Sequence, residues 1–239
     1  MIVGVEGAGP EPRLLHEDGA LLAIDKPAGR LVIPGRSGGE LSLREQLTVS
    51  HGPLWVVHRL DRGTSGVLIF ARTAEAHRDL NMQFERGEPR KTYLALVAGR
   101  PPDRFECDAG IAPARRGKMK PVPAGDPRGK RSRTAFRVLE RFEPAGGNGP
   151  LALVEAVPET GRTHQIRIHL RAAGFPLAFD PDYGEAEPRR AASGAVLLAR
   201  TPLHAATLTL RHPDGHQFTI EAPLTGDLGA ALAALRSPV

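Results

Sequence analysis

The sequence predicts an α+β fold built on one extended, largely antiparallel sheet with flanking helices. Short apolar runs rich in Leu, Val and Ile recur along the chain between turn residues, which is typical of buried strands. Helical patterns interrupt this series at only a few places, and neither a repeat nor a flexible linker divides the 239 residues. We therefore expect a loosely ordered, Gly- and Pro-rich segment over residues 1–12 and one domain over residues 13–239.

The apolar runs predict strands along the whole chain, and a polar, irregular stretch is expected from about residue 100 to residue 130. Lys26-Pro27-Ala28-Gly29 is a turn signature, because proline presets one backbone angle and glycine tolerates positive φ. The predicted strands span residues 21–25, 31–33, 54–57, 67–70, 91–99, 133–142, 151–158, 195–200, 204–210 and 217–223.

Helical spacing of apolar residues predicts helices over residues 40–47, 73–86, 161–174 and 226–236. Thr73 and Thr163 are the candidate caps of the second and third helices. Glycines follow the ends of both, as is common where a helix stops. The expected buried pairs, four residues apart, are Leu80 with Phe84 and Ile166 with Leu170.

The charge of the chain favours a polyanionic partner. The net charge is +5, and 27 of the 32 basic residues are arginines, which make bidentate contacts to phosphate. The same arginine content is also compatible with a bias of genome composition. A single cysteine excludes an internal disulfide and a cysteine metal cluster and suits a reduced cytosolic setting. With neither a signal peptide nor an apolar run of membrane-spanning length, we expect a cytoplasmic protein with no membrane contact.

A strongly polar segment, HRLDRGTSG (His58 to Gly66), connects two of the predicted core strands. A plain turn requires residues with special backbone angles, but it does not require His, two Arg and Asp within five positions. Loops held on a rigid scaffold often carry catalytic groups, and Asp61 is the candidate here. The alternative is that Asp61 caps the turn and pairs with Arg59 or Arg62.

Two further groups are not explained by a hydrophobic core. Tyr93 shares a strand face with Lys91, although a half-buried core tyrosine is the commoner role. In ETGRTHQIRIHLR, Arg162 precedes the predicted helix, while His164, Arg167 and Arg171 follow one of its faces. A helix N-terminus with a basic side suits phosphate, but a solvated cationic face has the same pattern.

Other chemistries find little support. His164 and His169 are five residues apart on a helix and point to different sides, so we reject metal ligation by this pair. The spacing of GDPRGKRS (residues 125–132) is one residue too short for a phosphate-binding loop, and Ser65 lacks the surroundings of a hydrolase nucleophile. Residues 115–133 carry eight basic residues and one acid, and this predicts a loop that contacts a nucleic-acid backbone.

The strings DKPAG, HRLDRGTSGVLIFA, KTYLALV and ETGRTHQIRIHLRAAGFPLAFDPDYG resemble, in this order, the large-ribosomal-subunit class A branch of the RNA pseudouridine synthases. The resemblance covers residues 21 to 210. It implies a single catalytic domain over residues 13–239, with a mixed, largely antiparallel sheet and an RNA-binding cleft. It also implies isomerisation of uridine in RNA to pseudouridine without a metal or an organic cofactor. Phe179 stands where the family commonly has glycine, and the chain leaves no room for the N-terminal RNA-binding module of several relatives.

The resemblance implies a role for individual residues. Asp61 matches the catalytic aspartate, Tyr93 the tyrosine that stacks on the target base, and Arg162 the arginine that pairs with the catalytic carboxylate. Arg59 matches a residue that fills the gap left by the flipped nucleotide. Further RNA contacts are expected from Arg62, Thr64, His164, Gln165, Arg167, Arg116, Lys118, Lys130 and Arg133.

We therefore expect a monomeric RNA uridine isomerase that acts on ribosomal or transfer RNA. One alternative is an RNA-binding or RNA-folding factor on the same scaffold whose catalysis is dispensable. A second is a metal-dependent hydrolase built on Asp and His, which would lose activity with a chelator.

Overall fold

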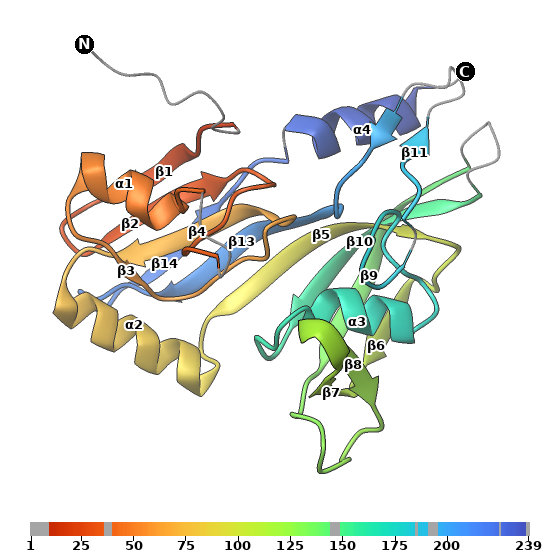
Figure 1. Ribbon diagram of the computed structural model, residues 1–239, viewed down its shortest axis with the longest axis horizontal. Helices are drawn as coiled ribbons and strands as arrows, with labels where there is room; N and C mark the ends of the chain where they lie inside the picture. Colours follow the sequence, from red (N-terminus) through yellow and green to blue (C-terminus); the bar gives the residue numbers. More distant parts are fainter. Residues whose placement is uncertain are drawn as a thin grey trace. The chain divides into compact units, whose positions relative to one another are not determined.

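A computed structural model describes residues 10–35, 40–143, 149–184, 186–190, 196–224 and 226–237 (Figure 1). The chain divides into two compact units, each with strands and helices. The first unit comprises the chain up to Pro89 together with Thr207–Ala222, and the second comprises Arg90–Ala206 and the chain from Pro223 onward. The predicted α+β class with mostly antiparallel pairing is confirmed. Most of the expected loose segment, residues 1–9, lies outside the described residues.

The sheet of the first unit is centred on β4 (Ser65–Ala71), in which every residue is buried. The strands follow the order β1, β2, β4, β13 and β14, with the two-residue β3 also paired to β4. Leu21 faces Ala71 and Lys26 faces Gly66 across the antiparallel β2–β4 pair. The bounds of its other strands are β1 Arg13–Glu17, β2 Leu21–Lys26, β3 Trp55–Val56, β13 Leu203–Arg211 and β14 Gln217–Glu221.

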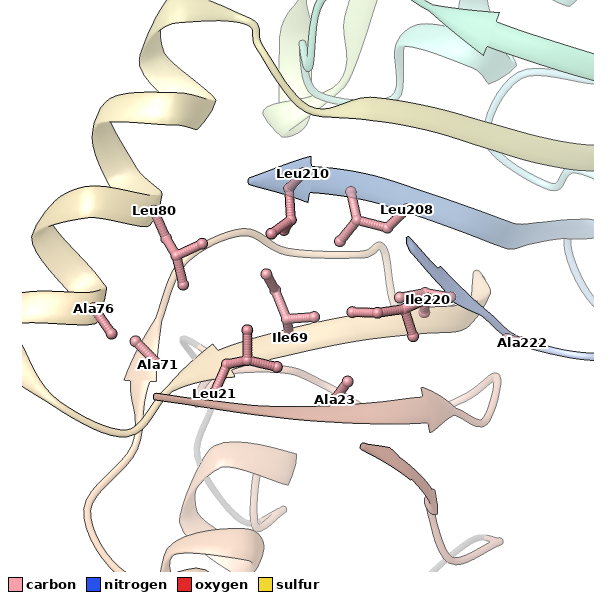
Figure 2. Close-up of a cluster of buried hydrophobic side chains, with 11 residues drawn as sticks. Leu21, Ala23, Ile69, Ala71, Ala76, Leu80, Leu208, Leu210, Ile220 and Ala222 are labelled. Carbon is pink, nitrogen blue, oxygen red and sulfur yellow. The ribbon is translucent and has the colours of Figure 1, made fainter. Parts of the chain in front are cut away.

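Helix α2 (Ala74–Arg86) covers one face of this sheet (Figure 2). It begins where the Thr73 hydroxyl accepts a hydrogen bond from the Ala76 N–H, and it ends at Gly87, which has a φ of 72°. Ala76 and Leu80 project from the helix onto alternate residues of β2 and β4, since every second side chain of a strand shares a face. The remaining core residues come from β13 and β14, namely Leu208, Leu210, Ile220 and Ala222. Both predicted helix ends and the packing of Leu80 are confirmed.

Helix α1 (Leu43–His51) starts three residues later than predicted. Its start is set by a capping box, in which the side chains of Ser42 and Glu45 each bond the other's backbone N–H. The predicted strand over residues 31–33 is wrong: the carbonyls of Leu31 and Val32 accept hydrogen bonds from the N–H groups of Leu43 and Arg44. These carbonyls therefore satisfy donors at the start of the helix that have no partner inside it.

The second unit holds a sheet in the order β13, β5, β10, β9 and β6, and helices α3 and α4 pack on its two faces. Small side chains such as Ala95, Ala152 and Ala156 lie beneath α3, whereas Leu96, Leu151 and Leu153 pack with α4 and β12. Because successive side chains of a strand point to opposite faces of the sheet, the sheet separates two hydrophobic cores. The elements are β5 Arg90–Ala98, β6 Arg104–Cys107, β9 Thr134–Phe142, β10 Leu151–Pro158, α3 Gln165–Ala172, β11 Arg189–Arg190, β12 Val196–Leu198 and α4 Gly226–Arg236.

The stretch from residue 100 to residue 130 is more regular than predicted. It contains β6 and a hairpin of β7 (Gly110–Pro113) and β8 (Met119–Val122), with the short helix η1 (Arg115–Gly117) between them. The basic segment 115–133 is therefore partly a hairpin and not wholly a loop. Gly129 is required next to it, because a Cβ at this position would lie 2.3 Å from Cγ2 of Val122.

The imidazole of His169 on α3 is completely buried and joins three segments of the second unit. Its Nδ1 lies 2.8 Å from the Thr134 hydroxyl, and its Nε2 lies 3.0 Å from the Ala109 carbonyl and 3.3 Å from the Ser132 hydroxyl. Desolvation lowers the pKa of His169, against the opposing effects of the Ala109 carbonyl and the charge of Asp108. The folded protein thus holds this ring neutral at pH values where an exposed histidine is protonated.

We expect the free energy of unfolding to fall as the pH drops below the ordinary histidine pKa of 6.5. In that range the unfolded chain binds a proton at His169 and the folded chain does not, so acid favours unfolding. His169→Gln should flatten this dependence by at most about 1.4 kcal/mol per pH unit. Urea denaturation of both proteins between about pH 5 and pH 8 measures the slope. An identical slope in the variant would contradict the assignment.

Candidate active site

The segment from His58 to Gly66 is held by a buried lysine. Lys26, at the end of β2, has no exposed surface, and its ammonium donates hydrogen bonds to three main-chain carbonyls. The Nζ–O distances are 2.7 Å to Thr64, 3.2 Å to Arg62 and 3.0 Å to Pro27. Two of these carbonyls belong to Arg62 and Thr64, which come one and three residues after Asp61. The lysine therefore fixes the backbone next to Asp61.

Side chains along this segment alternate between inside and outside. His58 accepts a hydrogen bond from the Ile69 N–H through Nε2 and stacks on Phe84 at a centroid distance of 5.0 Å. Leu60 is also buried, whereas Arg59 is exposed and Asp61 is half-buried. A tight turn follows, in which the Thr64 N–H donates to the Asp61 carbonyl at 3.0 Å. Two anchored side chains therefore present Arg59 and Asp61 from a constrained backbone.

The predicted Lys26–Gly29 turn supports the same segment from a second direction. Gly29 has a φ of 87°, its N–H donates to the Arg62 carbonyl at 2.7 Å, and its carbonyl accepts from Nε of Arg62 at 2.9 Å. The guanidinium of Arg62 also forms an ion pair with Glu40 at 3.0 Å and stays largely exposed. Arg62 therefore helps to fix the segment as well as carrying positive charge. Thr64 is buried, and the RNA contact expected of it from the sequence stays a prediction.

Arg162 lies on a loop that is fixed by the buried amide of Gln165. The Gln165 Oε1 accepts from the Arg162 N–H at 3.0 Å and from the Thr160 hydroxyl at 2.6 Å, while its Nε2 donates to the Arg133 carbonyl at 3.0 Å. Nε of Arg162 donates to the Arg131 carbonyl, and the residue remains exposed. Gln165 thus has a structural role in the interior, and the RNA contact expected of it stays a prediction.

The predicted Thr163 cap of α3 is wrong. The N-cap residue is His164, which has a φ of 57° and is the one non-glycine residue with positive φ in the described part of the chain. Its Nδ1 lies 2.7 Å from the Tyr183 hydroxyl, which also accepts a hydrogen bond from the Met119 N–H. A left-handed residue other than glycine is sparsely populated and needs such support. The start of α3 is therefore tied to the β7–β8 hairpin through Tyr183.

Arg167 does not face solvent as predicted but forms a buried ion pair with Asp180. The Nε–Oδ2 and Nη2–Oδ1 distances are 2.8 and 2.6 Å, and a second carboxylate, Asp182, lies 2.9 Å from Nη2. Asp180 is 1% exposed and also accepts the N–H groups of Asp182 and Tyr183. The FDPDYG turn is thereby fastened to α3, and the RNA contact expected of Arg167 stays a prediction for a side chain that is 6% exposed.

The basic residues predicted from segment 115–133 differ in their surroundings. Lys118 forms an ion pair with Asp182 at 3.3 Å, and Arg133 forms pairs with Glu106 at 2.7 Å and with Glu159 at 3.6 Å. Lys130 is exposed, and its backbone bonds Ile111. The backbone of Arg116 lies in η1, while its side chain falls outside the described part of the structure.

The predicted catalytic residues belong to different units. Asp61 lies in the first unit, whereas Tyr93 on β5 and Arg162 lie in the second. Tyr93 is half-buried and packs at the margin of the core beneath α3, with Ala156 as its cross-strand neighbour. The pairing of Arg162 with Asp61 and the stacking role of Tyr93 stay predictions.

Sequence reasoning missed two structural residues of these segments. The sequence pattern places Lys26 only in a turn, although a residue at the end of an apolar run can have a buried side chain. Asp180 lies in a turn whose proline and glycine dominate the pattern, and its ion pair with Arg167 spans 13 positions. Potential metal ligands in the described residues gather elsewhere, at His212, Asp214 and His216.

The chain is similar to known proteins in both sequence and fold. Residues 20–172 match the family model described as RNA pseudouridylate synthase. The chain belongs to this family. It is 40% identical to ribosomal large subunit pseudouridine synthase D of Nitrosomonas europaea over 94% of its own length and 65% of that protein. It is 42% identical to ribosomal large subunit pseudouridine synthase C of Yersinia pestis, over 93% of this chain and 69% of that protein. The chain thus spans about two thirds of the length of these relatives.

Solved structures of pseudouridylate synthases have the same fold. Human RNA pseudouridylate synthase domain containing 4 superimposes with a TM-score of 0.73 at 26% identity, over 94% of this chain and 93% of that one. Human RNA pseudouridylate synthase domain containing 1 superimposes with a TM-score of 0.72 at 27% identity, over 89% of this chain and 83% of that one. The predicted resemblance and the enzyme class, an isomerase of uridine in RNA, are confirmed. Among the described helices, none is both long and apolar enough to cross a membrane.

We expect Arg167→Met to destabilise the synthase by about 3–5 kcal/mol, because it leaves the buried Asp180 carboxylate without its guanidinium. Arg137→Met is the matched control, since its ion pair with Glu155 at 3.1 Å is exposed and contributes at most about 1 kcal/mol. Urea denaturation at neutral pH measures both changes. If Arg167→Met weakened RNA binding without a loss of stability, the surface role expected from the sequence would stand.

Lys26→Met should cost about 3 kcal/mol of unfolding free energy, because three carbonyls lose a charged donor in a buried place. It should also loosen the backbone of Asp61, so pseudouridine formation should fall at temperatures where the variant is still folded. Lys120→Met, at an exposed position of β8, is the control and should change stability by less than about 0.5 kcal/mol. Equal stability of the two variants would refute the role of Lys26.

Proposed function

We propose that this protein isomerises uridine to pseudouridine in structured ribosomal or transfer RNA, with Asp61 as the reactive carboxylate. The observation that carries the proposal is the His58–Gly66 segment, in which Lys26 and Gly29 constrain the backbone while Asp61 stays half-buried. A reactive group needs such a rigid support to hold its geometry against the substrate. The relatives named above are ribosomal RNA enzymes, which supports an RNA substrate of this class.

The target base has to leave its stacked position before it can reach a carboxylate, at a cost of a few kcal/mol. We assign Arg59 to the gap that the flipped nucleotide leaves, because its side chain is exposed two residues before Asp61. We assign Tyr93 to stacking on the flipped uracil, a contact that contributes about 1–3 kcal/mol. These two contacts would offset the cost of extrusion.

The isomerisation adds and removes nothing. The bond from N1 to C1′ breaks, the uracil turns while bound, C5 joins C1′ and gives up its proton to water, and N1 takes up a proton from water. An ionised Asp61 serves as nucleophile at C1′, as nucleophile at C6, or as base at C2′, and all three roles need the charged form. We assign Arg162 to an ion pair that holds this carboxylate in its charged form, because an opposite charge offsets partial burial.

We assign the contacts with the RNA backbone to the exposed basic residues of both units. Arg59 and Arg62 flank Asp61, and Lys130 follows the β7–β8 hairpin. Lys118 and Arg133 add partly neutralised charge, since each forms an ion pair with a carboxylate. Monomeric state and a cytoplasmic location stay predictions.

Asp61→Asn should abolish pseudouridine formation, while the Kd for RNA should stay within about threefold of the wild-type value. The reason is that the change replaces the reactive carboxylate by an unreactive amide of the same size. Release of a C5 tritium label or mapping of the modified RNA measures turnover, and a filter-binding titration measures affinity. Asp103→Asn is the control, because this carboxylate is exposed and pairs only with Arg141 among the described residues.

Near-normal turnover of the Asp61→Asn protein would overturn the catalytic assignment. A second outcome distinguishes the alternative function. If the inactive Asp61→Asn protein restored normal growth to a deletion strain, an RNA-binding or RNA-folding role with dispensable catalysis would be favoured. Indifference of the wild-type turnover to a chelator would remove the metal-dependent hydrolase.

Lys130→Ala should weaken binding of all RNA sequences and lower the slope of log K against log salt by about 0.7–0.9, the effect of one lost phosphate contact. Arg128→Ala in the same segment is the control, because its guanidinium is already bonded to Asp126 at 2.6 Å. Binding titrations at several salt concentrations measure the slopes. Equal slopes for the two variants would place the RNA away from this segment.

A further inference from the structure

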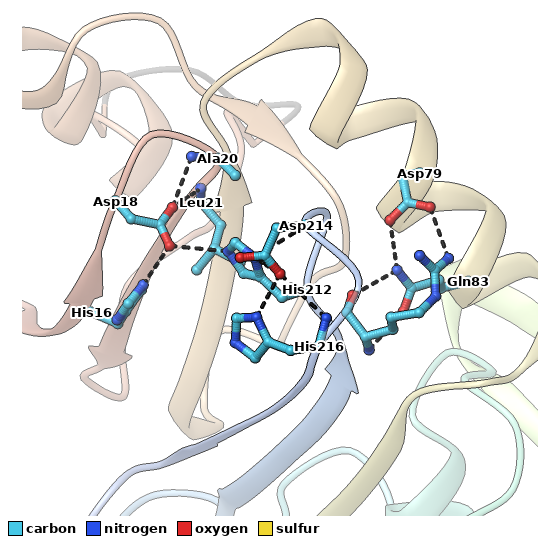
Figure 3. A network of polar contacts seen from close by, with 10 residues as sticks. His16, Asp18, Ala20, Leu21, Asp79, Gln83, His212, Asp214 and His216 are labelled. Atoms are coloured by element: carbon cyan, nitrogen blue, oxygen red, sulfur yellow. Dashed lines mark hydrogen bonds and ion pairs between the residues drawn. The ribbon is translucent and has the colours of Figure 1, made fainter.

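Three histidines and two aspartates meet at the edge of the first unit (Figure 3). His212, Asp214 and His216 lie in and beside the turn between β13 and β14, while His16 and Asp18 come from the turn between β1 and β2. A contact between His212 and Asp18, which are 194 residues apart in the sequence, joins the two turns. None of these side chains has a part in the proposed reaction.

The β13–β14 turn brings its alternate side chains together. The His212 N–H donates to the His216 carbonyl at 2.8 Å, and Gly215, with a φ of 104°, donates its N–H to the His212 carbonyl. As a result, Nδ1 of His212 and Nδ1 of His216 lie 2.9 and 2.5 Å from the same oxygen, Oδ1 of Asp214. All three potential ligand atoms lie within 4.8 Å of one another.

Both ring nitrogens of His212 face carboxylate oxygens. Nε2 lies 3.0 Å from Oδ2 of Asp18, and Nδ1 lies 2.9 Å from Oδ1 of Asp214. The Asp214 N–H points at Nδ1 at 3.3 Å and needs an acceptor there. A ring that a carboxylate holds at one nitrogen and that turns its other nitrogen toward further ligands is the arrangement that metal-binding histidines adopt.

Asp18 is well suited to be that orienting carboxylate. Its Oδ1 accepts the N–H groups of Ala20 and Leu21 at 2.7 and 2.9 Å, and its Oδ2 lies 2.7 Å from Nε2 of His16. These bonds hold the carboxylate in place beside the ring of His212, which is itself buried.

We propose that His212, Asp214 and His216 form a binding site for a divalent transition-metal ion of the zinc type. Two imidazole nitrogens and one carboxylate oxygen are a ligand set for zinc and its neighbours, and it disfavours magnesium and calcium, which prefer oxygen alone. Asp214 and His216 are 60% and 56% exposed, so the ion can enter from solvent and water can complete its coordination. Asp18 positions His212 and does not contact the ion.

The site is separate from the reaction proposed above. Asp18 precedes β2 and Lys26 ends it, so the site and the Asp61 segment lie at opposite ends of a strand about 16 Å long. A bound ion would join the β13–β14 turn to the turn that leads into β2. Its role is therefore to brace the scaffold, and catalysis should proceed without it.

Calorimetric titration of tag-free, chelator-treated protein with Zn²⁺ tests the proposal. We expect one ion per chain, and we expect His216→Gln and Asp214→Asn each to raise the Kd at least tenfold, since both positions are exposed and the variants should fold. Asp18→Asn should raise it by about 10–100-fold through the loss of orientation. Co²⁺ in place of Zn²⁺ should produce visible absorption that the His216→Gln protein lacks.

His51→Gln is the matched control, because this histidine is also paired with a carboxylate, Glu17 at 3.1 Å, but lies outside the cluster. It should bind Zn²⁺ as the wild type does. The proposal is overturned if the wild type binds no Zn²⁺, or if His216→Gln and His51→Gln bind it equally well. Pseudouridine formation by wild-type protein with and without Zn²⁺ should be equal; a metal-dependent rate would instead overturn the separation of the site from catalysis.

Discussion

The burial of the Lys26 ammonium is the constraint on which the His58–Gly66 segment depends. A charge without contact to water has to be surrounded by oriented dipoles, and here three main-chain carbonyls supply them. Two of these carbonyls belong to Arg62 and Thr64, directly after Asp61. The segment therefore cannot relax without taking two acceptors away from the buried ammonium. A polar loop thereby acquires the rigidity of the neighbouring strands.

The second unit uses a buried charge in the same way. The Arg167–Asp180 pair fastens the turn after α3, and that turn places Tyr183 against both His164 and the β8 backbone. Since a buried pair tolerates the loss of neither partner, it specifies one arrangement of helix, turn and hairpin. The basic hairpin is thus held in place by charges that are themselves hidden from RNA.

Sequence patterns predicted most of the elements, because the apolar runs and glycine stops are local signals. Thr73 and Gly87 bound α2 as expected, while α1 is bounded by the pair of Ser42 with Glu45 and by contacts to residues 31–32, which are tertiary. The family could be predicted from motifs, and the same motifs support the proposed role of Asp61. The interior positions of Gln165 and Arg167 could not, because a polar helix residue reads as exposed until its distant partner is known.

The chain passes between its two units at residues 89–90, 206–207 and 222–223. The two units therefore alternate along the chain, and Leu208, Leu210 and Ile220 complete a core that begins at Leu21. During synthesis, which proceeds from the N-terminus, the support of Asp61 stays unfinished until about residue 222 has left the ribosome. The order of translation thus delays the completion of this core until residues 90–206 of the second unit have been synthesised.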